Sequence, residues 1–281
     1  MSERIEMLQR PAVQTAPSRK RRLLPRRQWL LGDAAVGALI PLAALIIWQA
    51  ASSREWISPL FMPSPLAIAG AFAELTAAGE ITHHLGISAG RAAVGFLLGG
   101  GLGLMFGLLA GFSRSAEHVL DPSVQMLRMI PHLAIAPLII LWFGFGEVSK
   151  ILIIAKGAFF PLYIHTLTGI RGVDNKLFDV ARVLAFSRRQ QMLRLIMPAA
   201  LPQILLGLRL SLALSWLGLV VAELLGSQAG IGFLINVAKQ NAVTENIFVG
   251  ILIFAVVGKL VDSFVKLLER KWLHWRDSFE G

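Results

Sequence analysis

Long apolar runs separated by short polar stretches dominate the pattern of this chain. Six runs have about the 20 residues that a helix needs to cross a hydrocarbon core ~30 Å thick. They lie near 33–51, 87–111, 128–145, 149–170, 204–224 and 247–268. Trp29 and Trp48 bracket the first run, as tryptophans do at the two membrane interfaces. We therefore predict an all-α integral membrane protein with six spans, which places both termini on the same side.

The second run carries glycine at every fourth position. Because apolar side chains gain nothing by leaving lipid for one another, helices in membranes associate through close backbone contact, which small residues permit. The series therefore predicts a packing ridge, although it does not say against which helix. Its members are Gly95, Gly99, Gly103, Gly107 and Gly111.

Composition and charge support the membrane assignment. The chain is 55% hydrophobic and 16% charged, with a mean hydropathy of +0.65, whereas soluble domains average about 25% charged residues. Of the 27 Lys and Arg residues, 20 lie in 1–33, 112–128, 171–203 and 266–281, which the six-span arrangement places at one face. This asymmetry is the positive-inside rule and identifies that face as cytoplasmic. The net charge of +10 therefore does not indicate nucleic-acid binding.

The sequence contains no pattern that indicates catalysis, a metal site or nucleotide binding. The pattern G-x-x-x-x-G-K-S/T of phosphate-binding loops is absent, and so is cysteine. His83 and His84 are adjacent and the other histidines are isolated, so no spacing suits a metal. We predict no cofactor in this chain. The expected domains are a basic cytoplasmic tail over 1–28 and a membrane domain over 29–281.

Between the fourth and fifth spans lies a basic polar segment of about thirty residues, 171–202. Its apolar positions recur at helical spacing, Ser187 can cap a helix over 188–197, and Pro198 is expected to end that helix. A short amphipathic helix of this kind suits a groove on another protein. The same arginines also suit anionic lipid headgroups, and the residues alone do not decide between the two.

The segment resembles the EAA loop of permease subunits of ATP-binding-cassette importers. The corresponding spacing gives Asp179-Val180-Ala181, then Ala185 in place of the pattern's Gly, then Leu195-Ile196-Met197-Pro198. The resemblance covers about residues 60–275. The segments LDPSVQMLRMIPHLAIAPLIILWFGFGE and KLLERKWLHW are similar to the aliphatic sulfonate branch of the sulfonate, nitrate and taurine permeases.

This resemblance implies a type I, MetI-like permease fold in the bacterial inner membrane, crossed several times with both termini cytoplasmic. It implies a second copy of the chain, two separate ATPase subunits that hold ATP and Mg, a periplasmic binding protein, and surrounding lipid. The transported molecule would be an organosulfonate, with nitrate, taurine and related compounds as alternatives. The ATPase-coupling residues would be Asp179, Ala181, Ala185, Arg188, Leu195, Met197 and Pro198.

Polar residues inside the spans are candidates for the translocation path, because such residues are costly there. Lys156 can attract an anion or can extend toward the outer face and Glu147. Gln125, His132 and Trp216 are further candidates. Lys259 and Asp262 are i, i+3 neighbours and are expected to pair.

A competing interpretation is a secondary transporter driven by an ion gradient. Such a protein favours an inverted repeat and a buried carboxylate at mid-depth. The sequence shows no such repeat, Glu223 lies near a span end, and Asp262 has Lys259 beside it.

Overall fold

The computed structural model describes residues 29–273, and the predicted tail over 1–28 lies outside this range. The chain divides into a unit that ends at Ala50 and a unit that begins at Ala51. The first unit holds most of α1 (Trp29–Ser53), an apolar helix that contains Pro41. The helices of the second unit are α2 (Pro65–Ala77), α3 (Glu80–Phe112), α4 (Arg114–Arg128), α5 (Ala136–Phe143), α6 (Glu147–Arg171), α7 (Asn175–Val183), α8 (Arg188–Gln190), the π-helix η2 (Gln191–Ile196), α9 (Met197–Gly226), α10 (Ile231–Gln240) and α11 (Thr244–Trp272).

Within the described range, four helical stretches are long and apolar enough to cross a membrane: Glu80–Phe112, Glu147–Arg171, Arg188–Gly226 and Thr244–Trp272. They correspond to the second, fourth, fifth and sixth predicted spans. The prediction of one helix over 128–145 is wrong. Helix α4 ends at Arg128, residues 129–135 are not helical, and α5 has only 8 residues. Pro131 lies in this break, where its ring and its missing N–H prevent a continuous helix.

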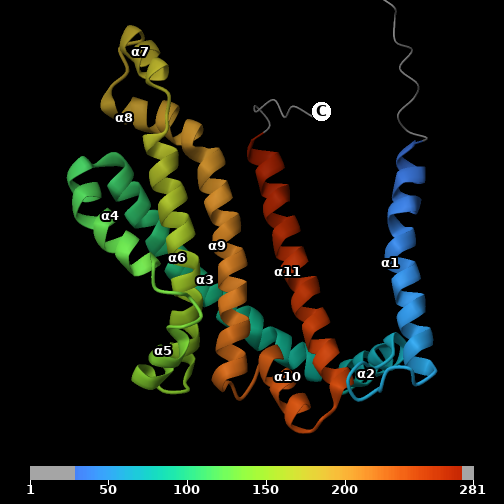
Figure 1. Cartoon of the computed structure of the whole chain (residues 1–281). Coiled ribbons are helices and arrows are strands. Elements are labelled where there is room, and N and C mark those ends of the chain that lie inside the picture. The colour runs from blue at the N-terminus through green and yellow to red at the C-terminus, as the bar shows by residue number, and fades with distance from the viewer. Residues whose placement is uncertain (1–28, 274–281) are drawn as a thin grey trace, which may run out of the picture. The chain divides into compact units, whose positions relative to one another are not determined.

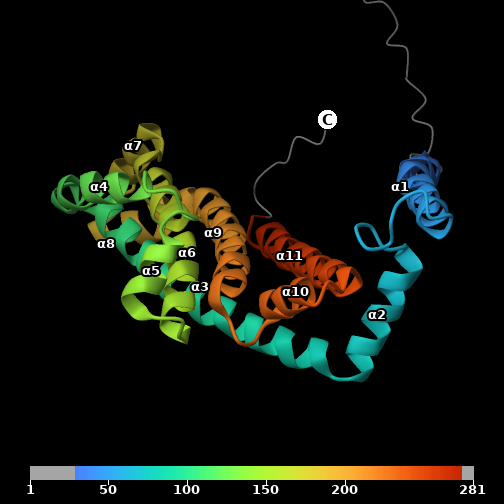
Figure 2. The same cartoon turned by 60° about the horizontal axis from the view of Figure 1, so that its bottom comes forward.

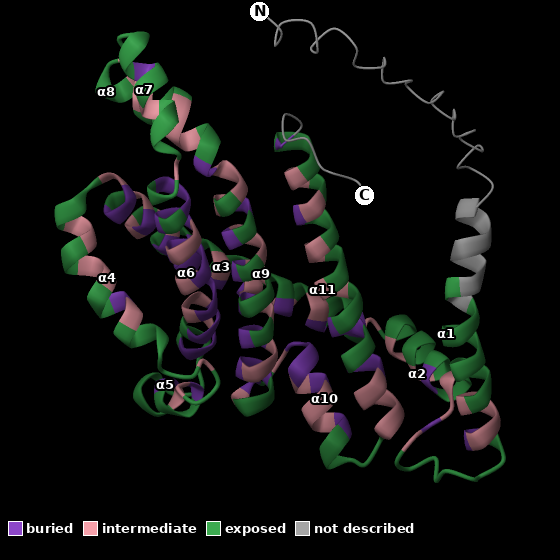
Figure 3. Cartoon of the chain, turned by 45° about the horizontal axis from the view of Figure 1, so that its top comes forward, coloured by how far each residue is buried: buried purple, intermediate pink, exposed green. Residues whose placement is uncertain are grey.

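The centre of the second unit consists of α3, α6 and α9. Helix α6 packs along α3 and along α9 (Figures 1 and 2). Buried positions concentrate in these helices, whereas α7 and α8 are almost entirely exposed (Figure 3). Helices α7 and α8 lie beyond one end of the α6–α9 pair, and α10 lies at the opposite end (Figure 1). The two ends can therefore meet different aqueous phases and different partners.

The glycine ridge of α3 lies against α6, which is the partner that the sequence left open. All five ridge glycines are buried. A Cβ atom added at Gly103 would meet the carbonyl oxygen of Phe159, and one added at Gly95 would lie 2.5 Å from Cγ2 of Ile154. At Gly101, on the same helix but off the ridge, an added Cβ would meet nothing within 4 Å. The ridge is therefore a line of close approach between two helices.

A second seam of small residues joins α9 to α6. Its buried members on α9 are Gly207, Ser211, Ser215 and Gly218. The Ser211 hydroxyl donates to the Ala158 carbonyl at 2.5 Å, so this small side chain bonds directly to the backbone of α6. Since these positions recur at intervals of three to four residues, the same small-residue rule that identified the α3 ridge would have identified this seam.

Helix α11 contacts α9 through polar bonds as well as packing. Asp262 accepts from Nε of Arg209 at 2.7 Å and lies 2.9 Å from Nζ of Lys266. The predicted pair of Lys259 with Asp262 is therefore wrong. One helical turn brings Lys266 to the same carboxylate, and the interhelical Arg209 supplies the second cation.

Candidate functional site

Helix α7 ends in a turn that requires an unusual backbone conformation at Ala185. Phe186 N–H donates to the Ala181 carbonyl at 2.9 Å and Ala185 N–H donates to the Arg182 carbonyl at 3.0 Å. These two bonds form a Schellman cap, in which the residue after the cap takes the left-handed conformation that suits glycine. Ala185 has φ of 50°. It occupies the position where the EAA pattern has Gly, so the turn is present here with an alanine.

The surface of α7 carries apolar side chains that no residue within 29–273 covers. Val183 is 87% exposed, and Leu177, Val180 and Leu184 are also exposed. Asp179 pairs with Arg182 at 3.1 Å on the same helix, and Ala181 is buried beneath the turn. An exposed apolar patch at the tip of a polar segment is typical of a surface that another protein covers.

The predicted helix after Ser187 begins as expected, but the prediction that Pro198 ends it is wrong. Ser187 does cap the helix, with the reciprocal Gln190 side-chain bond of a capping box. The helix then continues through η2 into α9, so that one stretch runs over Arg188–Gly226. Met197 N–H bonds to the Met192 carbonyl, five residues back. In a regular α-helix, the ring of Pro198 would clash with the carbonyl four residues back. The wider π turn shifts the carbonyls of the preceding turn, so Pro198 fits in the first turn of α9.

The remaining residues predicted to couple lie on this continuous rod. Arg188 is exposed in α8, Leu195 is half-buried in η2, and Met197 is half-buried at the start of α9. Because α9 follows η2 without a loop, residues 188–197 are continuous with the helix that packs on α6.

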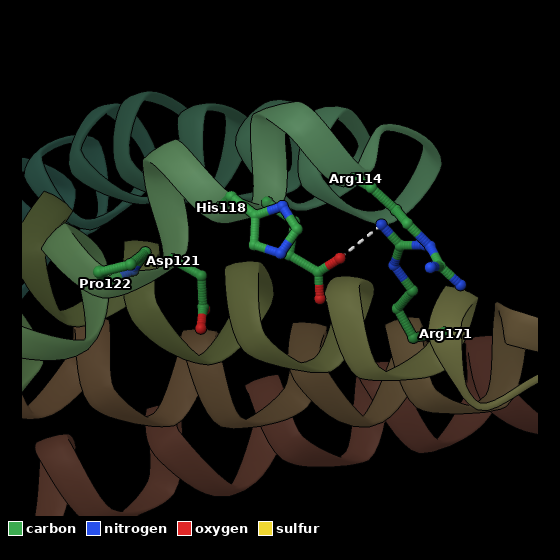
Figure 4. A pocket seen from close by; sticks show the side chains of 6 residues that line it. Arg114, His118, Asp121, Pro122 and Arg171 are labelled. Atoms are coloured by element: carbon green, nitrogen blue, oxygen red, sulfur yellow. Dashed lines mark ion pairs between the residues drawn. The ribbon is translucent and has the colours of Figure 1, made fainter.

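Polar side chains bind helix α4 to the end of α6 that is followed by α7. Arg171 Nη2 lies 2.5 Å from the Glu117 carboxylate and donates to the Ala110 carbonyl at 3.1 Å. The Tyr163 hydroxyl donates to Asp121 at 3.2 Å. A polar cavity of ≈ 440 Å³ lies beside these contacts, and in it Arg171 reaches from α6 toward the side chains of α4 (Figure 4). Its lining is Arg114, Glu117, His118, Asp121, Pro122 and Arg171. The contacts tie α4 to the end of α6 that leads into α7.

At the opposite end, a partly buried group of charges joins α3, α6 and α9. Arg91 of α3 contacts Glu147 at 2.6 Å and Glu223 at 2.8 Å, and Lys150 contacts Glu147 at 2.9 Å. Glu223 is 0% exposed and also accepts from Ser88 Oγ. The buried Arg91, Lys150 and Glu223 and the exposed Glu147 thus balance in charge, which is what buried ions need to be tolerated.

The same carboxylate fixes the turn between α9 and α10. Gly232 N–H donates to Glu223 Oε2 at 2.9 Å, and the Ala229 carbonyl accepts a hydrogen bond from Nη1 of Arg91 at 2.6 Å. An added Cβ at Gly230, whose φ is 108°, would collide with the Glu223 carboxylate. Sequence reasoning missed this network. Opposite charges near the outer ends of two predicted spans, Arg91 and Glu223, were the signal that could have found it.

A cavity of ≈ 450 Å³ brings two of the predicted path residues together. Lys156 and His132 both line it, between α6, α9 and the break that follows α4. Lys156 Nζ donates to the Ile130 carbonyl at 3.1 Å. It does not reach Glu147, which is occupied by Arg91 and Lys150. The full lining is Arg128, Ile130, Pro131, His132, Lys156, Gly157, Phe160, Pro161, Ile164, His165, Leu210, Ala213 and Leu214.

The other two predicted path residues lie elsewhere. Gln125 donates to Asp121 on its own helix at 3.3 Å. Trp216 faces α11, where its Nε1 donates to the Phe254 carbonyl at 3.1 Å and the two rings meet edge to face. Neither lines the cavity that holds Lys156. Hydropathy gave the depth of these residues but not the direction in which each side chain points.

Comparison with known proteins decides the family. The model for "Binding-protein-dependent transport system inner membrane component" matches residues 103–274, more than half of the chain. The chain belongs to this family. The permease is therefore an integral inner-membrane component of a transport system that works with a binding protein.

Relatives of the permease share nearly its whole length. It is 58% identical to the putative aliphatic sulfonates transport permease protein of Bacillus subtilis, over 96% of this chain and 94% of that one. The protein of the same description in Escherichia coli is 44% identical, over 91% and 96%. The taurine transport system permease protein of E. coli is 33% identical, over 88% and 92%.

Proposed function

We propose that the permease is the transmembrane subunit of an ATP-binding-cassette importer for aliphatic sulfonates. The observation that carries this proposal is the 58% identity to a sulfonate permease protein across 96% of the chain. The taurine permease is similar at only 33%, and a bicarbonate transport system permease protein of Synechococcus elongatus at 34%. Sulfonate is favoured over these substrates by the higher identity.

In the proposed assembly, two copies of the permease join two ATPase subunits, which hold ATP and Mg, and a periplasmic binding protein delivers the anion. The permease itself is neither an enzyme nor a nucleotide-binding chain. It crosses the membrane six times with both termini cytoplasmic. The third crossing consists of α4 and α5 with the break between them. The positions of α4 and α5 toward opposite ends of α6 support a broken crossing (Figure 1).

The ATPase docks on α7 and α8 in this proposal. Three features support it: the exposed apolar face around Val183, the glycine-type cap at Ala185, and the unbroken path from Arg188 into α9. Nucleotide-driven closure of the ATPase pair would move this segment. The rigid rod would pass the movement to the α6–α9 interface, which alternates access between the two faces.

The test is co-purification of the full complex with a tag on the permease. Val183→Asp places a charge on the proposed docking face and should reduce the ATPase recovered by at least about tenfold, because an unpaired charge at a buried contact costs a few kcal/mol. The matched control is Val243→Asp, which is 38% exposed at the N-cap of α11 and lies outside both the docking face and the apolar stretches. Equal loss of ATPase in both variants, or no loss in Val183→Asp, would contradict docking at α7.

A further inference from the structure

The cavity between α6, α9 and the break after α4 has basic groups and no acidic group in its lining. Arg128, His132, Lys156 and His165 line it, and no Asp or Glu does. The remainder of the wall is apolar. A cavity of ≈ 450 Å³ is within the range of small-molecule sites, about 300–1,000 Å³. Its chemistry therefore suits a small anion with an apolar part.

Lys156 differs from Arg91 and Arg209, two other basic residues at helix interfaces, because no carboxylate of the described residues balances its charge. Arg91 and Arg209 each contact a carboxylate of another helix. Among the residues that the structure describes, Lys156 contacts the Ile130 carbonyl and lies 5.5 Å from the centre of the Phe160 ring, and no carboxylate pairs with it. A charge without a counterion is costly at membrane depth. A passing anion would supply the missing partner, and two of the three ammonium hydrogens are free of the bond to Ile130.

The apolar part of the wall suits an alkyl chain. The apolar side chains come from α6 and α9 and line the same cavity as Lys156. They include Phe160, Ile164, Leu210 and Leu214. An alkanesulfonate has one permanent anionic head and one apolar tail, so both parts find complementary surface. Taurine carries an additional ammonium group, and the cavity offers it no carboxylate.

We propose that this cavity holds the transported anion in transit, with the sulfonate on Lys156 and the alkyl chain against α6 and α9. This inference rests on the proposed function and extends it from the transporter to a site within it. Phe160 and Leu214 limit the length of the tail, so the permease itself contributes to chain-length selectivity, in addition to the binding protein.

The test measures uptake by the complete complex in proteoliposomes, with one fixed binding protein. Ethanesulfonate, butanesulfonate and hexanesulfonate are supplied separately. Because the binding protein is the same throughout, it cancels in the ratio of variant to wild type. Lys156→Gln should lower uptake of all three about tenfold in proteoliposomes that hold the same amount of assembled complex, and Lys156→Arg should retain more of the uptake than Lys156→Gln.

Leu214→Phe narrows the cavity and should raise the ratio of ethanesulfonate to hexanesulfonate uptake at least about threefold. This ratio does not depend on the amount of folded complex. The matched controls are Lys259→Gln, which neutralises a lysine of α11 outside the cavity, and Leu217→Phe, which enlarges an exposed leucine of α9 outside it.

The outcomes separate the two proposals. If the wild-type complex takes up no sulfonate, the proposed function fails. If it does take up sulfonate, but Lys156→Gln behaves as Lys259→Gln does and Leu214→Phe leaves the chain-length ratio unchanged, then the cavity is not on the path. In that case Lys156 serves only to hold the Ile130 carbonyl.

Discussion

Adding a single methyl group to the glycine ridge should destabilise the permease, whereas adding it two residues away should not. At Gly99, an added Cβ would collide with the backbone of Ala155 on α6, which cannot rotate away as a side chain can. At Gly101, an added Cβ meets nothing within 4 Å. The pair Gly99→Ala and Gly101→Ala therefore compares identical chemical changes on one helix.

The magnitude follows from the two environments. Forcing extra volume into a well-packed contact costs about 1–3 kcal/mol. Replacing an unhindered helical glycine by alanine gains up to ~1 kcal/mol in aqueous helices, because alanine restricts the unfolded backbone. The two variants should differ by about 1–4 kcal/mol in stability. For a chain of this size ~1 kcal/mol moves the midpoint of thermal unfolding by roughly 2–4 °C.

Thermal unfolding of the purified permease in one detergent, followed by helical circular dichroism, measures the difference. Gly99→Ala should unfold at least about 2 °C below Gly101→Ala, and Gly101→Ala should match or exceed the wild type. Midpoints of the two variants within 1 °C of each other would refute the argument that α3 and α6 meet backbone to backbone at the ridge.

Two further changes test the ends of the α6–α9 pair. Ala185→Gly should relieve a left-handed alanine and stabilise the α7 turn by ~1 kcal/mol; hydrogen exchange at Phe186 N–H should slow, and unchanged or faster exchange would contradict a strained cap. Arg91→Leu leaves the fully buried Glu223 without its cation and should cost about 3–5 kcal/mol. Unfolding in denaturant measures this, with Arg54→Leu, an exposed arginine outside the network, as the control.

The α3 ridge and the seam on α9 illustrate how far sequence reasoning reached into the fold. Spacing alone identified the ridge because small residues at i, i+4 have one physical use in lipid, which is close approach. The identity of α6 as partner needed the tertiary structure, because any helix with a matching surface satisfies the same spacing. Likewise, hydropathy marked 128–145 as apolar enough to cross, but the backbone break at Pro131 decided that it is not one helix.

The site residues divide in the same way. The position of Ala185 in the EAA spacing followed from sequence, whereas its φ of 50° and the Schellman bonds explain why that position favours glycine. Lys156 and His132 were predicted from their polarity and their position within a span, and both line one cavity. Trp216, which was also predicted to lie in mid-membrane, faces α11 instead. Depth is a property of position along a helix, but direction depends on how the helix is rotated against its neighbours.

The sequence by itself determined that this chain is helical and lies in a membrane, and it predicts that the basic face meets the cytoplasm and that 171–202 couples to a partner. Each of these follows from local composition, because transfer into lipid is settled residue by residue along the chain. Only the tertiary structure decided which charges neutralise one another, as Arg91 does with Glu147 and Glu223, and that Lys156 pairs with no carboxylate of the described residues. Electrostatic energy depends on separation in space, and residues 132 positions apart in the chain become neighbours only when the helices pack.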